Sequence, residues 1–254
     1  MHKKAFSLIE LSIVLIIIGL LVGSVFTGQK LLSQSKLRSV VTDLERYKVA
    51  YNAFFATFEE LPGDLLDSSA SALFGVTNGT RHAAEPAGDK LIGGHQEASM
   101  AFWHLKLAGL ISGGYDGVRL TAEVPGVSTG LAKFSDNTAF HFFSFGQNAN
   151  QWGYGTGAIY GMRGITALGF GVIKTSNDRV AEFAAITPTE GFYLDQKLDD
   201  GIPYLGRVLA DHGSDVGSDQ KCTDFSGYAN NYSSGTVEYQ LSNEAVACRM
   251  MFIM

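Results

Sequence analysis

Charged residues, proline and cysteine are all scarce in this chain of 254 residues. Asp, Glu, Lys and Arg together make up only 17% of the sequence, and there are five prolines and two cysteines. The formal net charge of −6 leaves no excess of Lys and Arg for a phosphate backbone, so nucleic-acid binding is not expected. Apolar residues reach 46%, which is ample for a packed core and excludes a disordered chain.

Motifs that support catalysis are also missing. The six histidines are scattered along the chain, and none of them forms a His-Glu-x-x-His pair. There is no phosphate-binding P-loop, and no Gly-x-Gly-x-x-Gly opens onto a helix. The sequence therefore predicts a protein that is not an enzyme and holds no organic cofactor.

The N-terminal stretch, by contrast, is strongly apolar. Lys3 and Lys4 are followed by 21 residues, Phe6 to Phe26, that carry a single charge at Glu10. A helix of that length crosses a hydrocarbon core of about 30 Å, and the two lysines favour a cytoplasmic N-terminus. An ordinary secretory signal has a shorter apolar core and an Ala-x-Ala site, neither of which occurs here. The stretch therefore predicts one retained membrane anchor.

The residues around Glu10 resemble a known processing signal. Lys3–Glu10 (KKAFSLIE), followed by an unbroken Leu/Ile/Val run, is similar to the cleavage and methylation signal of type IV pilins and type II secretion pseudopilins. The resemblance implies that prepilin peptidase cleaves between Ala5 and Phe6 and methylates the new amino group of Phe6. The family usually has Gly before the cut, where this chain has Ala5.

Glu10 needs a partner, because a carboxylate at membrane depth costs about 3 kcal/mol. The resemblance implies that Glu10 of one subunit neutralises the Phe6 amine of its neighbour in a filament. The alternative is a carboxylate that reaches the membrane interface on its own. Cleavage removes Lys3 and Lys4, which takes the formal charge from −6 to −8.

A second helical pattern continues the anchor. From Gly28 to Glu60, apolar residues recur at spacings of three and four, and no proline occurs before Pro62. Gly19, Gly23 and Gly28 are weak points inside the long helix that results. The domain boundaries expected are a leader at 1–5, a long helix at 6–60 with 6–26 in the membrane, and a globular head at 61–254.

The head is expected to be α+β, with a mainly antiparallel sheet, as the pilin resemblance also implies. We expect a loop region from Asp64 to Gly94, with one short hairpin at Asn78-Gly79, and a helix from Gln96 to Ile111 that packs on the sheet. On that helix, one apolar face is formed by Met100, Trp103, Leu107 and Leu110. The expected strands are Phe140–Phe145, Ala158–Tyr160, Ala167–Lys174 and Glu182–Ile186, followed by a short helical turn that starts at Thr187 and ends before Asp195.

A disulfide or a calcium site could stabilise the region near the C-terminus. Cys222 and Cys248 lie outside the cytoplasm if the anchor is oriented as above, so a disulfide worth about 3 kcal/mol is favoured over two buried thiols. Calcium is the weaker candidate, because neither of the available carboxylate sets has EF-hand spacing and no metal site is therefore predicted. Those sets are Asp195, Asp199 and Asp200, or Asp211, Asp215 and Asp219.

These features together predict a structural subunit of a type IV pilus or a type II secretion pseudopilus. Its partners would be prepilin peptidase, other pilin or pseudopilin subunits and the bacterial inner membrane, with the head in the periplasm or outside the cell. The size of the head favours a minor or tip position. The alternative is a membrane-anchored extracytoplasmic binding or hydrolytic domain that does not polymerise.

Overall fold

The computed structural model of the chain describes residues 7–77, 87–118, 123–145, 164–173, 181, 183–213, 215–216, 221–224 and 237–254. The expected leader, Phe6, the Asn78-Gly79 turn, the strand at Ala158–Tyr160 and Asp219 lie outside these residues.

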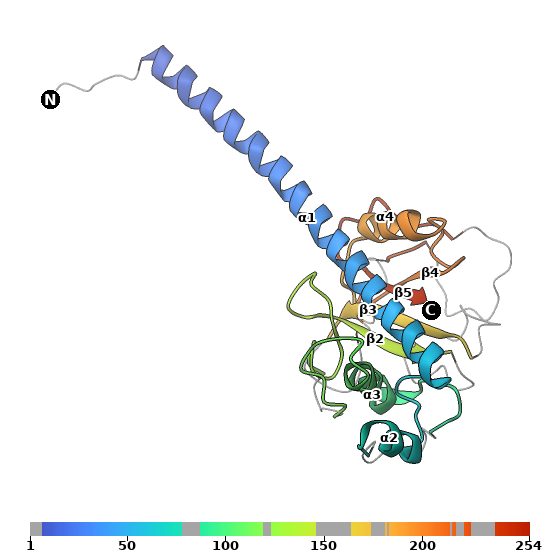
Figure 1. Cartoon of the computed structure of the whole chain (residues 1–254). Coiled ribbons are helices and arrows are strands. Elements are labelled where there is room, and N and C mark those ends of the chain that lie inside the picture. The colour runs from blue at the N-terminus through green and yellow to red at the C-terminus, as the bar shows by residue number, and fades with distance from the viewer. Residues whose placement is uncertain are drawn as a thin grey trace.

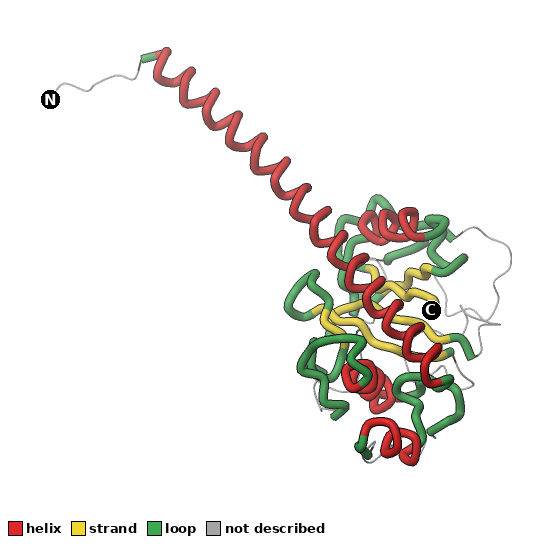
Figure 2. The backbone as a smooth tube through the Cα atoms, in the orientation of Figure 1, coloured by secondary structure: helices red, strands yellow, loops and turns green. Residues whose placement is uncertain are grey.

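One helix dominates the molecule. Helix α1 runs without a break from Leu8 to Phe58, 51 residues, and projects far beyond the head (Figures 1 and 2). The predicted weak points, Gly19, Gly23 and Gly28, lie inside it and do not interrupt it. Glu59 ends the helix in the left-handed conformation and donates its N–H to the carbonyl of Phe55, so the chain turns before Pro62 is reached. The predicted long helix is confirmed.

The head is built on a five-stranded antiparallel sheet. Its spatial order is β1-β2-β3-β5-β4, so β5, the last strand in the chain, lies between β3 and β4. The strand bounds are β1 Gly130–Leu131, β2 Thr138–Ser144, β3 Thr166–Val172, β4 Val208–His212 and β5 Cys248–Ile253. The register places Phe140 opposite Phe170 and Phe170 opposite Met250. Side chains of alternate residues therefore line the face that the helices cover.

The C-terminal half of α1 packs across this sheet together with α3, Gly94–Leu107. Tyr47 and Phe54 of α1 are fully buried, and the Tyr47 ring meets Phe102 of α3 and Phe140 of β2 edge-on at 5.2 and 5.5 Å. Edge-to-face rings at such distances add about 0.5–1.5 kcal/mol to the burial of their area. The aromatic residues thus fix the angle at which α1 leaves the head.

Several details of the head differ from expectation. The region from Asp64 to Gly94 is not all loop, because α2 forms at Asp67–Phe74. Helix α3 ends at Leu107 rather than Ile111, and its buried face includes Phe102 and Leu105, whereas Trp103 and Leu107 are only half-buried. Phe102 faces the phenylalanines of the sheet, which explains its burial.

The prediction of a strand at Glu182–Ile186 is also wrong for the residues of this segment that the structure describes. Phe183 and Ile186 form only isolated bridges, to Val172 and Cys248. The helical turn at Thr187 is a full helix, α4, from Pro188 to Leu198. Thr187 caps it reciprocally with Glu190, which is the start signal that the sequence offers.

Candidate functional site: the anchor helix and the carboxylates

The first turn of α1 holds Glu10 in a capping box. Glu10 Oε2 accepts the Ser7 N–H at 2.9 Å, and Ser7 Oγ accepts the Ile9 N–H at 3.3 Å. Within a single chain, the carboxylate therefore points back toward the N-terminus of the helix, where the positive end of the helix dipole stabilises a negative charge. Sequence reasoning missed this intramolecular role, although Ser7-Leu-Ile-Glu10 matches the Ser-x-x-Glu signature of a capping box.

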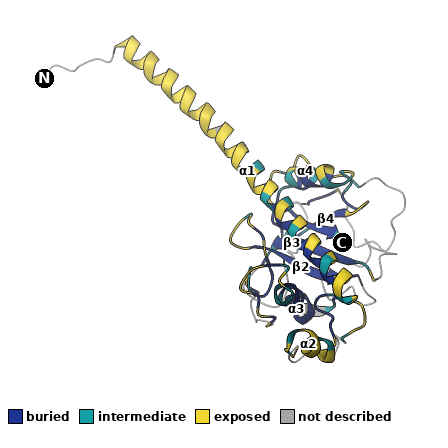
Figure 3. Ribbon diagram, viewed as in Figure 1, coloured by how far each residue is buried: buried dark blue, intermediate teal, exposed yellow. Residues whose placement is uncertain are grey.

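The first half of α1 is exposed around its whole circumference (Figure 3). Leu8 is 87% exposed, Leu20 71% and Val25 still 56%, while the head buries α1 only from Leu37 onward. Fully burying one such aliphatic side chain is worth about 1.5–3 kcal/mol. Among the described residues, α1 is the one helix long and apolar enough to cross a membrane. This surface requires lipid or other apolar helices around it.

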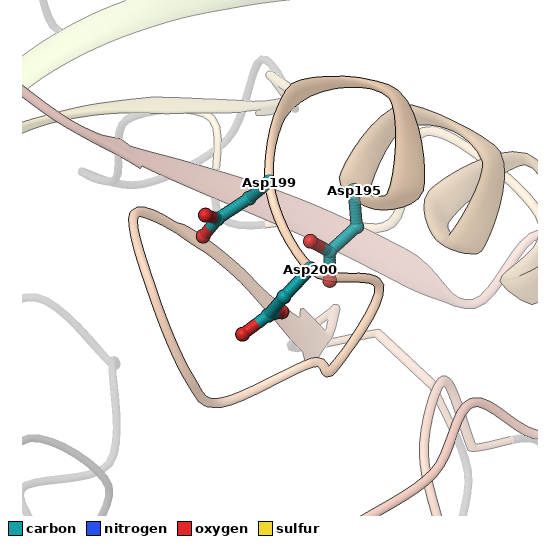
Figure 4. A group of neighbouring side chains, drawn as sticks. All are labelled: Asp195, Asp199 and Asp200. Carbon is teal, nitrogen blue, oxygen red and sulfur yellow. The ribbon is translucent and has the colours of Figure 1, made fainter.

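Asp195, Asp199 and Asp200 lie together at the end of α4 (Figure 4), and their nearest carboxylate oxygens are within 4.8 Å of one another. Asp195 is buried and accepts the Tyr239 hydroxyl at 2.8 Å and the Gly201 N–H at 3.1 Å. Burial raises the pKa of Asp195 to about 6, against the opposing effect of these two hydrogen bonds. Asp195 therefore ties the end of α4 to Tyr239.

The other two carboxylates of this group brace the loop that leads to β4. Asp199 Oδ2 accepts the backbone N–H groups of Arg207 and Val208, and Asp200 Oδ1 accepts that of Ile202 at 2.8 Å. Carboxylates that accept nearby backbone N–H groups stabilise turns without a cation. The structure thus brings together the first predicted set, and its hydrogen bonds give each member a structural task.

The second acidic set is not brought together in the part of the chain that is described. Asp211 lies in β4 and accepts from Arg249 Nη2 at 2.8 Å and from the Tyr204 hydroxyl at 3.0 Å. Burial disfavours its charge, but a hydrogen bond from His212 and the charge of Arg249 hold the pKa of Asp211 well below its usual range. Asp215 instead accepts the Ala184 N–H at 3.1 Å. Asp211 is therefore one half of a buried ion pair in the sheet.

The predicted disulfide between Cys222 and Cys248 is present, with the two Cα atoms 4.8 Å apart. Both cysteines are fully buried, and Cys248 is the first residue of β5. The backbone beside Cys222 pairs with the segment around Tyr239, since the Gln240 N–H donates to the Cys222 carbonyl at 3.0 Å. The bridge and the Asp195–Tyr239 hydrogen bond therefore anchor the same C-terminal segment.

One pentapeptide needs comment because it matches the Gly-x-Ser-x-Gly pattern of hydrolases, which sequence reasoning overlooked. In Gly126–Gly130 (GVSTG), the buried Ser128 Oγ accepts the Val124 N–H at 2.8 Å, and the Ser128 N–H donates to the Val124 carbonyl. A nucleophile elbow connects a strand to a helix and exposes its serine. Here the segment is a tight turn that leads into the short strand β1.

The fold defines a class: a long helix, with a first half apolar enough to cross a membrane, that carries an α+β head with pilin-like architecture. Comparison with protein families adds the chemistry of the N-terminus. Residues 1–26 match the prokaryotic N-terminal methylation motif, which is the prepilin signal of type IV pilins and pseudopilins. The chain therefore carries the N-terminal signal of a processed subunit of the type IV pilin or pseudopilin kind. No curated protein and no solved structure matches the chain significantly.

Proposed function

We propose that the chain is a structural subunit of a type IV pilus or a type II secretion pseudopilus, which waits in the inner membrane until it is assembled. The observation that carries this proposal is the exposed apolar half of α1, which the head leaves uncovered and which the methylation motif overlaps. Lipid covers this surface before assembly, and the corresponding helices of neighbouring subunits cover it afterwards. Gly19 and Gly23, which have open space around them, allow such helices to approach closely.

Processing prepares the helix for this exchange. Prepilin peptidase cleaves between Ala5 and Phe6 and methylates Phe6, which leaves a positive amino group one residue before Ser7. Because Glu10 already reaches back to the Ser7 N–H, its carboxylate lies at the right end of the helix to meet such an amine. In a low-dielectric filament core, an unpaired Glu10 or an unpaired amine would be strongly penalised. The charge pair thus stabilises the one axial register at which Glu10 of a subunit meets the Phe6 amine of its neighbour.

The large head, residues 61–254, suits a minor or tip position better than a repeating shaft position. We propose no catalytic role and no cofactor for it. The hydrogen bonds of Asp195 and Asp199 support a bracing role for the acidic group rather than calcium binding. A membrane-anchored domain that never polymerises is the competing function.

Substitution of Glu10 tests the proposal. Glu10→Val removes both the charge and the cap, whereas Glu10→Gln keeps a capping box and removes only the charge. We expect both variants to be cleaved and to keep the melting temperature of the head, yet to be missing from sheared filaments imaged with an antibody to the head. Normal incorporation of Glu10→Gln would contradict the charge pair, and absence of the wild-type chain from every filament would favour the unpolymerised domain.

A further inference from the structure

A groove of about 590 Å³ opens beside the last turns of α1. Tyr51 and Phe55 of α1, with Glu59 just after the helix, form one wall. Ile165, which precedes β3, and Met254, which follows β5, form the other. This groove, named here the distal groove, lies at the C-terminal end of α1. That end of the helix is the one farthest from its projecting apolar half (Figure 1). Its volume is in the range of pockets that accept ligands or protruding side chains.

The distal groove is apolar inside and acidic at its rim. Phe55 is 50% exposed beside it, although the same helix buries Phe54 completely. Among the charged residues that line the groove, Glu59, Glu60 and Asp64 outnumber Lys90. Asp64 accepts hydrogen bonds from the backbone N–H groups of residues 88–90, and Glu60 accepts the Ser69 hydroxyl. Of the three acidic residues, Glu59 is the one whose side chain is exposed to solvent. The groove therefore favours an apolar segment that carries a positive charge.

The same helix carries such a segment at the opposite end of the head. The stem segment, Leu31–Arg38, contains Lys36 and Arg38 and no acidic residue. Leu31 and Leu32 remain about 60% exposed, and both basic residues are exposed as well. Just below the head, the stem segment thus presents exposed leucines followed by two cations. This order matches a groove that is apolar inside and acidic at its rim.

The spacing along α1 fits a repeated contact between copies. The head touches α1 from Ser33, whose hydroxyl donates to Glu190, to the end of the helix at Phe58. Those 26 residues correspond to about 39 Å of helix. A second copy shifted along the axis by about that length would set its stem segment over the distal groove of the first, with one head stacked above the other. A head-to-tail contact of this kind repeats without closing and so builds a filament.

We infer that the distal groove is the docking site for the stem segment of a second copy of this chain, with Phe55 and Glu59 meeting Leu31, Leu32 and Arg38. The inference rests on the proposed function, because it names the partner surface used within the filament. It adds a contact between heads to the burial of the anchor helices.

Photo-crosslinking at the groove tests this contact in the full chain. With p-benzoylphenylalanine in place of Phe55, irradiation of sheared filaments should yield a dimer whose linked peptide contains residues 28–38 of the second copy. A product linked to another protein, to a different part of the second copy, or no product at all from filaments that form normally would overturn the inference and leave the proposed function standing. Absence of filaments altogether would overturn both.

Charge exchange supplies the matched control. Glu59→Lys and Arg38→Glu should each lower the yield of the photoproduct about two- to fivefold, as for a single exposed ion pair. The two substitutions in one chain should restore it, because the groove and the stem then exchange signs together. Glu45→Lys, the same change at an exposed α1 position outside the groove, should leave the yield unaltered. A failure of the double variant to recover, or an equal loss with Glu45→Lys, would overturn the pairing.

Discussion

Removing the disulfide between Cys222 and Cys248 should cost the head a large part of its stability. The bridge spans 26 residues of sequence, and the chain-entropy relation for a loop of that length gives about 3.5 kcal/mol at 25 °C. Typical domains are stable by only about 5–15 kcal/mol, so the loss is a substantial fraction. Since both sulfur atoms are buried, Ala is the suitable replacement at both positions, because it leaves no unsatisfied hydroxyl group behind.

The assay is thermal unfolding of the full chain in detergent, with the Cys222→Ala/Cys248→Ala variant compared with the oxidised wild type. For a domain of this size, a change of 1 kcal/mol shifts the melting temperature by about 2–4 °C, so the variant should melt about 7–14 °C lower. Reduced wild-type protein should melt close to the variant, and a reducing agent should leave the variant itself unchanged. Coincident melting of variant and oxidised wild type would refute the reasoning, because it would mean that the bridge does not constrain the unfolded chain.

Two further outcomes follow from burial in the head. Phe54→Ala removes a fully buried ring from α1 and should lower the free energy of unfolding by about 3–5 kcal/mol. Val49→Ala, on the exposed side of the same helix, should change it by less than about 0.5 kcal/mol. Equal effects of the two substitutions in denaturant titrations would show that α1 does not pack as described. Burial raises the pKa values of Asp64 and Asp195 to about 6, above the value of an unfolded aspartate, so the folded head binds protons more tightly and should gain stability as the pH falls from 7.5 to 4.5. Melting temperatures across that range should rise toward acid, and Asp195→Asn should flatten the rise; a wild-type curve that falls toward acid would contradict the assigned pKa values.

The long helix and its apolar first half were predictable because their signals are strong and local. An apolar run followed by apolar residues at spacings of three and four is typical of a helix, and the sequence contains no proline before Pro62. Thr187-Pro188 likewise marked the start of α4, although the pattern beyond it was too weakly periodic to give its length. Two cysteines in a head that we expect outside the cytoplasm were enough to predict their bridge.

The sheet was harder to read because charge interrupts its strands. Strand β5 contains Arg249 and β4 contains Asp211, and each charge is tolerated only because the other lies 2.8 Å away in the fold. No pattern local to either strand reveals that partnership. Helix α2, in a stretch rich in Ser and Ala, looked like a loop because it is short and buries only Ala70, so its sequence shows no apolar helical spacing. The distal groove joins α1 to Ile165 and Met254, which no sequence motif connects.

The most direct test of the account is the mass of the N-terminal peptide of the mature protein isolated from the cell envelope. The account predicts a peptide that begins at Phe6 and carries one methyl group on its amine, in a protein that retains the apolar half of α1. A mature chain that still contains Lys3–Ala5, or one that has lost the α1 anchor, would contradict assembly through a processed prepilin helix.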